Sequence, residues 1–248
     1  MQYLAKNILQ FDAWEDIFLN LETVANSLQD GKCIILKSAF TKEYCKRVRS
    51  YLNNISSNTF PNYYPISNNS PNHFRINLED DRASVKGFFY QFNFFPHNQD
   101  LLNTFNVYRM VFEAKDKISA LISNNDYLYN SLKKPPHNYI SRVGYQFYPI
   151  NKGYLSDHSD IVGSNQYVVP TILMSKKGHD FISGGFFYIM NDGTYIYPED
   201  YTDIGDMIFF NPRLNHGVEL VRSNLICDQE LIDTHGRWMG FATTSSIT

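Results

Sequence analysis

The part of the chain that follows Pro135-Pro136 is a series of short β-like runs separated by Gly, Asn, Asp and Pro. This series constrains the fold more than any other feature, because several short strands at such spacing are typical of a β-sandwich or barrel. The predicted strands are residues 139–148, 166–174, 185–191, 206–211, 216–222 and 237–244. We therefore expect an antiparallel β-core in this part of the chain.

The part of the chain before this series has helical periodicity. Apolar residues recur at helical spacing from Trp14 to Leu28, and Thr41 is placed to cap a second helix. A third helix is expected from about Asp100 to about Ser123. The predicted fold class is therefore mainly β with a helical N-terminal part, in which helices brace one face of the β-core.

Composition indicates a globular chain without an internal boundary. Hydrophobic residues make up 43% and charged residues 19% of the 248 residues, which favours a folded chain with a sizeable core. No repeat, low-complexity tract or long linker divides the sequence. We expect a single domain over residues 1–248, in which residues 1–138 are largely helical support and substrate-side elements and residues 139–248 are the β-core with the metal site.

Charge and hydropathy give no support to several classes of partner. The net charge of −3 gives no basic footprint for nucleic acid. No apolar run approaches the roughly 18 residues that span a bilayer, and the N-terminus does not have the pattern of a signal peptide. The cysteines Cys33, Cys45 and Cys227 are odd in number and far apart, which favours buried thiols in a reducing compartment. We expect a cytoplasmic protein; the sequence leaves its oligomeric state open.

The stretch GYLSDHSDIVGS, residues 153–164, contains a candidate half of a metal site. On an extended segment, residues i and i+2 point the same way, so His158 and Asp160 can reach the same ion. Two histidines and one carboxylate on one face of a metal are the ligand set of non-haem Fe(II) sites. His216 is the candidate third ligand, because it follows the predicted strand 206–211 and starts the next one.

Arg237 opens the predicted strand 237–244. A guanidinium inside a β-core needs an anionic partner, because an unpaired buried charge is costly. A ligand carboxylate, held bidentately, is one such partner, and an internal acid is the other. Arg222, six residues after His216, is the rival candidate for binding a ligand carboxylate.

These motifs together resemble the Fe(II)/2-oxoglutarate-dependent dioxygenases. The resemblance covers about residues 139–244 and rests on HSD at 158–160, GG at 184–185, GDMIFFNPRLNHGVELV at 205–221 and Arg237. The N-terminal stretch SLQDGKCIILKSAFTKEYCKRVRSYL is also similar to the opening of phytanoyl-CoA-hydroxylase-like and prolyl-hydroxylase-like members.

The resemblance implies a double-stranded β-helix, a cupin-like jelly roll. It implies Fe(II) held by His158, Asp160 and His216, O₂ as oxidant, and 2-oxoglutarate that chelates iron and pairs its far carboxylate with Arg237. In many members the Arg or Lys follows the distal histidine by about ten residues, so the stretch NLICDQELIDTHG would be an inserted loop. Halogenating members lack the carboxylate that Asp160 supplies, which favours hydroxylation, although desaturation and cyclisation stay open.

Further candidates come from strand faces. Arg142, Gly144, Gln146 and Tyr148 share one face of the predicted strand 139–148, where they can contact cosubstrate or substrate, and the other face suits packing against helices. Thr171 is placed similarly for 2-oxoglutarate, and Arg75 is a candidate substrate anchor. The remaining histidines have no partner at ligand spacing and are assigned surface or structural roles: His73, His97, His137, His179 and His235.

The expected activity is hydroxylation of an unactivated C–H bond of a small molecule, with release of succinate and CO₂. The alternative is a cupin-like protein that binds a metal or ligand without redox chemistry, which would not need Arg237.

Overall fold

A computed structural model describes residues 1–79, 81, 83, 85–124, 139–160, 167–223 and 235–247. Within these residues the helices are α1 (Trp14–Leu19), α2 (Leu21–Gln29), α3 (Lys42–Asn58), α4 (Thr104–Val107), α5 (Arg109–Ser123) and the 3₁₀ turn η1 (Pro198–Tyr201). The strands of the first part are β1 (Gln2–Ala5), β2 (Ile8–Phe11), β3 (Cys33–Leu36), β4 (His73–Leu78) and β5 (Gly87–Phe94). The later strands are β6 (Tyr139–Pro149), β7 (Tyr154–His158), β8 (Val169–Leu173), β9 (Ser183–Ile189), β10 (Tyr195–Ile196), β11 (Met207–Phe210), β12 (His216–Arg222) and β13 (Gly236–Ser246).

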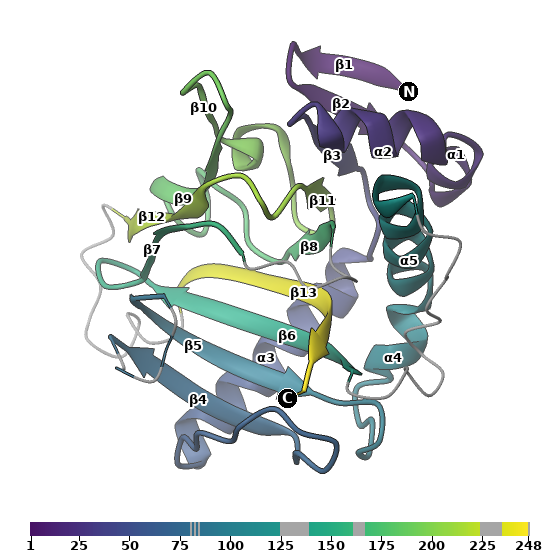
Figure 1. The fold of residues 1–248 in the computed structure, drawn as a ribbon. Helices are drawn as coiled ribbons and strands as arrows, with labels where there is room; N and C mark the ends of the chain where they lie inside the picture. The colour runs from purple at the N-terminus through teal and green to yellow at the C-terminus, as the bar shows by residue number, and fades with distance from the viewer. Residues whose placement is uncertain are drawn as a thin grey trace.

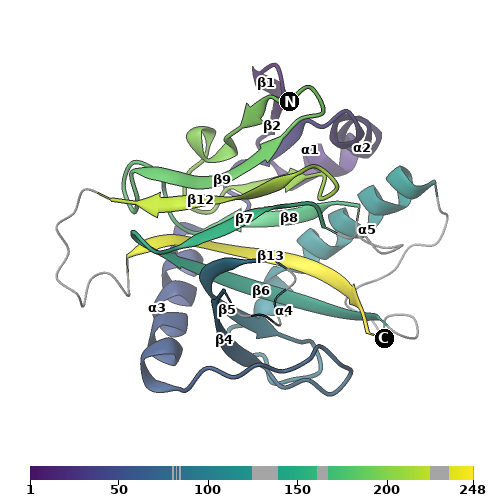
Figure 2. The ribbon, with the colours of Figure 1, turned by 60° about the vertical axis from the view of Figure 1, so that its left-hand side comes forward.

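The strands form one hydrogen-bonded path that curls around an interior. The order is β1-β2-β3-β11-β8-β13-β6-β5-β7-β12-β9-β10, and β4 pairs with β5. In Figure 2, β9 and β12 lie above β7 and β8, while β13, β6, β5 and β4 lie below. Side chains from both groups of strands line one cavity, so the interior of this curled sheet holds the candidate site.

The helices cover the outer face of the strands β6 and β13, with α3 behind β5 and β6 and α5 beside β13 (Figure 1). Val143, Tyr145 and Phe147 of β6 are fully buried in this layer. The hydroxyl of Tyr145 lies 3.1 Å from that of Tyr44 in α3, and the ring of Phe147 stacks on Trp238 of β13. This confirms the prediction that the face of β6 that carries Val143, Tyr145 and Phe147 packs against helices.

Local side-chain chemistry sets the helix boundaries. Thr41 caps α3 as predicted, because its hydroxyl accepts the Tyr44 N–H at 3.1 Å. The single helix predicted from Trp14 is divided at Asn20, whose backbone leaves the helical region. The third helix starts at Thr104 rather than at Asp100, since the Asp100 carboxylate accepts the N–H groups of Thr104 and Phe105.

Strands in the first part of the chain are the main departure from the sequence prediction. The described part of residues 1–138 holds five strands, where helices were expected to dominate. One of them, β3, confirms the short buried strand that the sequence predicts at Cys33–Leu36, and β4 and β5 extend the sheet beyond β6. The short strand β7 was also missed, because its residues alternate little in polarity. The described cysteines, Cys33 and Cys45, are buried and free; Cys227 lies outside the described residues. None of the described helices is long and apolar enough to cross a membrane.

Candidate metal centre

Three side chains from two strand ends and one loop converge in the interior. One ligating atom each of His158, Asp160 and His216 lies within 4.8 Å of the others. His158 is the last residue of β7 and His216 the first of β12, and the two are paired across the strands. Asp160 follows β7, where its N–H donates to the carbonyl of Pro212 at 2.9 Å. This bond ties the loop after β7 to the turn before β12.

Both imidazole rings are oriented by their own backbone. The Nδ1 of His158 lies 2.9 Å from the Ser156 carbonyl, and the Nδ1 of His216 lies 2.8 Å from the Leu214 carbonyl. Each Nδ1 therefore carries the ring proton in the neutral form, which leaves Nε2 with its lone pair. The two Nε2 atoms lie 3.6 Å and 4.0 Å from the Asp160 carboxylate oxygens.

The charges in the triad depend on one another. Burial opposes ionisation of Asp160, but the two histidines and Arg142 outweigh burial and lower the pKa of its carboxyl. Burial and the neighbouring His158 lower the pKa of His216. Burial also disfavours the charged His158, but the carboxylate of Asp160 outweighs it and raises the pKa of His158. A carboxylate beside a neutral His216 imidazole is in the form that binds a divalent metal.

The donor set fits a non-haem iron ion. Two imidazole nitrogens and a carboxylate from one side leave the remaining positions open toward the cavity. The Nδ1–H bonds to carbonyls are the outer contacts that hold metal-ligating histidines in place. The open side of the triad faces a cavity of about 490 Å³.

Residues predicted to contact cosubstrate line this cavity. Gln146, Tyr148 and Thr171 are among the residues that form its wall, together with all three members of the triad. Tyr148 is fully buried and donates its hydroxyl to Gln146 Oε1 at 2.6 Å. Burial raises the pKa of Tyr148, so the phenol keeps its proton.

Arg237 is paired with an internal acid, which is the second of the two partners expected for it. Its Nε donates to Glu199 Oε1 at 2.7 Å, and its side chain is fully buried. The Nη1 and Nη2 atoms are also buried and have no hydrogen-bond partner among the described residues. Arg237 does not line the cavity; the ring of Tyr148, which does, covers the guanidinium with its centroid 5.2 Å from Cζ.

Gly185 makes room for this ion pair. Glu199 Oε2 accepts the N–H of Phe186 at 3.0 Å, and a Cβ atom on Gly185 would overlap this carboxylate oxygen. Gly185 also has φ +99°, which L-residues rarely adopt. Gly185 of the Gly-Gly pair thus has a structural reason.

Arg222 and Asp157 lie outside the site. Arg222 is exposed at the end of β12 and does not line the cavity. Asp157 is exposed and accepts from the side chain of Asn215 at 3.0 Å. Asp157 points away from the triad, as its position between Ser156 and His158 predicts.

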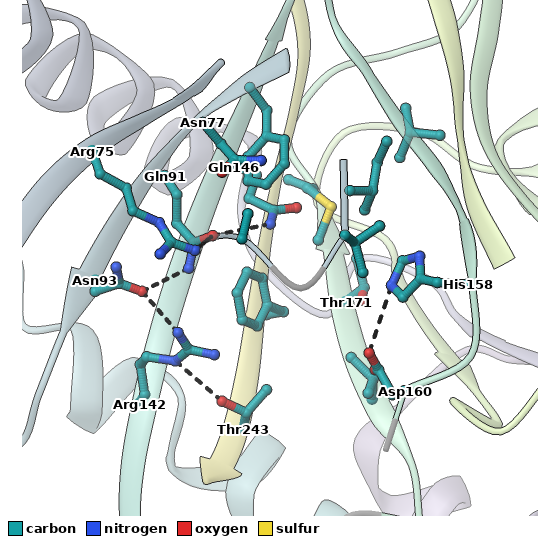
Figure 3. A pocket seen from close by; sticks show the side chains of 18 of the residues that line it. Arg75, Asn77, Gln91, Asn93, Arg142, Gln146, His158, Asp160, Thr171 and Thr243 are labelled. Carbon is teal, nitrogen blue, oxygen red and sulfur yellow. Dashed lines mark hydrogen bonds and ion pairs between the residues drawn. The ribbon is translucent and has the colours of Figure 1, made fainter. Parts of the chain in front are cut away.

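The two candidate substrate residues, Arg75 and Arg142, both line the cavity. Figure 3 shows them on the wall opposite His158 and Asp160, together with Asn77, Gln91 and Asn93. These three amides and His73, which was assigned a surface or structural role, also line the cavity and were missed. The signal was present in the sequence as polar residues at every second position: His73, Arg75 and Asn77 in β4, and Gln91 and Asn93 in β5.

Comparison with known proteins identifies the fold. No protein-family model matches the sequence, and no curated protein matches it. A dioxygenase for auxin oxidation from Arabidopsis thaliana, solved with 2-oxoglutarate, is similar at a TM-score of 0.57 and 9% identity, over 97% of this chain and 92% of that one. A prolyl-4-hydroxylase from Pseudomonas putida has a TM-score of 0.52 and 12% identity, over 90% and 97%.

A prolyl hydroxylase from Trichoplax adhaerens, solved with a peptide fragment of a hypoxia inducible factor, is similar at a TM-score of 0.51 and 14% identity, over 94% of this chain and 92% of that one. Likeness at these identities defines the fold: the chain is a double-stranded β-helix braced by helices, as found in 2-oxoglutarate oxygenases and as predicted. Within this fold, the described residues place a His-Asp-His triad in the interior.

Proposed function

We propose that this protein is an Fe(II)- and 2-oxoglutarate-dependent oxygenase that hydroxylates an unactivated C–H bond of a small molecule. The observation that carries the proposal is the convergence of His158, Asp160 and His216 on the wall of one cavity. The fold supports it, because the solved structures with this architecture include 2-oxoglutarate oxygenases.

Named residues fit each bound group. His158, Asp160 and His216 would hold iron. The two Nη atoms of Arg237, which have no partner among the described residues, would bind the far carboxylate of 2-oxoglutarate once the ring of Tyr148, which covers them, moves aside. Gln146, Tyr148 and Thr171 supply hydrogen-bonding groups along the cavity wall. Iron and 2-oxoglutarate, when bound, supply the oxidising chemistry that uses O₂, releases succinate and CO₂, and places a hydroxyl group on the substrate.

The protein's own contribution is to orient these groups and to exclude water. The carbonyls of Ser156 and Leu214 fix the two imidazole rings before metal binds. Phe186 and Phe210 pack against the ring of His216, at 6.2 Å and 4.9 Å between centroids. These apolar side chains exclude water from one side of the metal position, where it would compete with the reacting groups.

A small molecule suits the cavity. Its volume of about 490 Å³ lies within the range of small-ligand sites. Of the similar structures, one is named for auxin oxidation and another was solved with a peptide, so the fold alone does not choose between these classes. The volume of the cavity is the reason to propose the smaller substrate.

The test is anaerobic addition of Fe(II) and 2-oxoglutarate to the purified protein. The proposal predicts a weak charge-transfer absorption in the visible range and, in air, succinate release that depends on both additions. Iron uptake no greater than that of Asp160→Ala, together with no absorption band, would refute it. Iron uptake without a band and without succinate would instead favour the non-redox metal-binding protein.

A further inference from the structure

One wall of the cavity carries two arginines that face the metal centre. Arg75 lies on β4 and Arg142 on β6, and both side chains are half-buried. Figure 3 shows the two guanidinium groups on the same side of the cavity, across from His158 and Asp160. No acidic oxygen of any described residue lies within 4.0 Å of either guanidinium.

Neutral amides are the main partners of these arginines. Arg75 Nη2 donates to Gln91 Oε1 at 3.3 Å, and Arg142 Nη1 donates to Asn93 Oδ1 at 3.1 Å. The two amides are joined, because Gln91 Nε2 donates to Asn93 Oδ1 at 2.8 Å. Among the described residues, Arg142 Nε contacts the hydroxyl of Thr243, at 3.4 Å. This network orients both guanidiniums but neutralises neither.

His73 adds no compensating charge. Its Nδ1 lies 3.0 Å from the Pro71 carbonyl, and its Nε2 lies 2.9 Å from the amide nitrogen of Asn93. This pattern requires a proton on Nδ1 and a lone pair on Nε2, which is the neutral imidazole. Burial lowers the pKa of His73, in agreement with that form.

Several polar atoms of this wall have no partner within the described structure. Arg75 Nε is buried without a hydrogen bond, and so are both side-chain atoms of Asn77, a residue that is 1% exposed and lines the cavity. Buried polar atoms without partners are costly and uncommon in folded proteins. A ligand that accepts hydrogen bonds from Arg75 Nε and Asn77 Nδ2, and donates one to Asn77 Oδ1, accounts for their retention.

The charges of the site leave an excess of one positive charge. Among the described residues, the cavity lining holds two arginines against one carboxylate, Asp160. Fe(II) and 2-oxoglutarate carry opposite charges of equal size, and Arg237 is matched by Glu199. Burial and the nearby Arg75 lower the pKa of Arg142 to about 10, so it remains charged at neutral pH.

We propose that Arg75 and Arg142 together bind an anionic group of the substrate, a carboxylate or a phosphate, on the wall opposite the metal. The inference rests on the proposed function and names the substrate class of that site. The anion is held between two guanidiniums whose donor geometry matches paired oxygens. The rest of the substrate then extends toward the triad, and Asn77 is placed to hydrogen-bond its polar groups.

Direct titration tests the proposal without knowledge of the substrate. The probes are benzoate and phenyl phosphate, with benzamide and benzyl alcohol as neutral counterparts, added to anaerobic protein with saturating Fe(II) and 2-oxoglutarate and followed by calorimetry. At least one anion is expected to bind about tenfold or more tightly than its neutral counterpart. Arg75→Met and Arg142→Met are each expected to remove that preference. Arg109→Met, which changes an exposed arginine on α5, is expected to leave it intact.

Three results would overturn the proposal. The first is no binding of either anion at millimolar concentration, and the second is equal binding by the arginine variants. The same titration is repeated without Fe(II) and 2-oxoglutarate. The third result is displacement of the probe in this repeat when 2-oxoglutarate is added, which would assign the arginines to the cosubstrate. Arginine-dependent anion binding in a protein that takes up no iron would refute the oxygenase but keep the anion site.

Thermal unfolding of the free protein separates a binding role from a structural one. If the guanidiniums await a ligand, Arg142→Met removes an uncompensated charge, and its unfolding midpoint should equal or exceed that of the wild type. A midpoint several degrees lower would mean that Arg142 mainly supports the fold, which would contradict the proposal.

Discussion

His158 and His216 occupy paired positions on β7 and β12, with ring centroids 4.4 Å apart. Each ring is held by the carbonyl two residues before it, Ser156 for one and Leu214 for the other. The two ligand candidates are therefore oriented by the same local geometry at adjacent strand ends. A metal that binds here meets rings that need little rearrangement.

Asp160→Ala should abolish tight Fe(II) binding, because the third donor of the triad is lost. Even residues that only support metal ligands typically contribute 10- to 100-fold to affinity, so the loss should be at least about a hundredfold. Calorimetric titration with Fe(II) under anaerobic conditions measures it. Asp157→Ala is the matched control, since that neighbouring carboxylate is exposed and bonded to Asn215. Equal losses in both variants would contradict the assigned ligand.

Local patterns explain which parts of the site were predicted from sequence. That His158 and Asp160 point the same way depends only on an extended backbone. The block from Gly205 to Val221 contains the residues that predict a strand, a turn and the start of the next strand. These features need no knowledge of distant residues. The predicted strands 139–148 and 216–222 likewise match β6 and β12 closely.

Long-range pairing explains what was missed. Arg237 donates a hydrogen bond to Glu199, 38 residues away in the sequence, and Arg142 donates one to Asn93, 49 residues away. Nothing in either segment alone signals such contacts, because pairing between strands decides them. The polar alternation of β4 and β5 was visible, but its meaning required knowing that this face lines a cavity.

Gly185→Ala should destabilise the protein more than Gly178→Ala. Both glycines have positive φ, +99° and +84°, so both variants incur a similar backbone penalty of about 1 kcal/mol. A Cβ atom at 185 also displaces the Glu199 carboxylate, whereas one at 178 meets nothing within 4 Å. Urea unfolding measures the difference. Equal destabilisation would show that Glu199 moves without cost.

Acid should weaken the protein partly through Asp203. Bonds from Lys42, the Ile204 N–H and Lys176 lower the pKa of this carboxyl to about 2 in the folded state. Because the folded pKa is below the unfolded value of about 3.9, the contribution is complete above pH 4 and is lost as the pH falls toward 2. Asp203→Asn should therefore flatten the dependence of unfolding free energy on pH in this window. Asp30→Asn, an exposed site, controls for the loss of one negative charge; an equal effect there would contradict the assignment.

Glu199→Gln should destabilise the free protein and make its stability depend on 2-oxoglutarate. The change leaves the buried Arg237 without an anion, which typically costs about 3–5 kcal/mol. With Fe(II) present, 2-oxoglutarate at a hundred times its dissociation constant for Glu199→Gln should return about 2.7 kcal/mol to that variant. The same concentration should return less to the wild type, whose Arg237 is already paired with Glu199. Glu219→Gln, at an exposed carboxylate bonded to Tyr197, is the control. The comparison is the rise in unfolding midpoint on adding 2-oxoglutarate. A rise no larger in Glu199→Gln than in the wild type would show that the cosubstrate does not reach Arg237 more readily once its partner is gone.

Arg237→Met should weaken 2-oxoglutarate binding, because the far carboxylate would lose its cationic partner. Fe(II) binding should be unchanged, because Arg237 is not one of the three proposed iron ligands. Loss of a charge-assisted contact of about 1.5–3 kcal/mol corresponds to about 10- to 100-fold in the dissociation constant. The charge-transfer absorption of the anaerobic Fe(II) protein, titrated with 2-oxoglutarate, measures this constant directly. Arg222→Met is the control, because Arg222 is exposed and outside the cavity. A higher dissociation constant for 2-oxoglutarate in Arg222→Met or Arg142→Met, with no change in Arg237→Met, would show that an arginine other than Arg237 binds the far carboxylate.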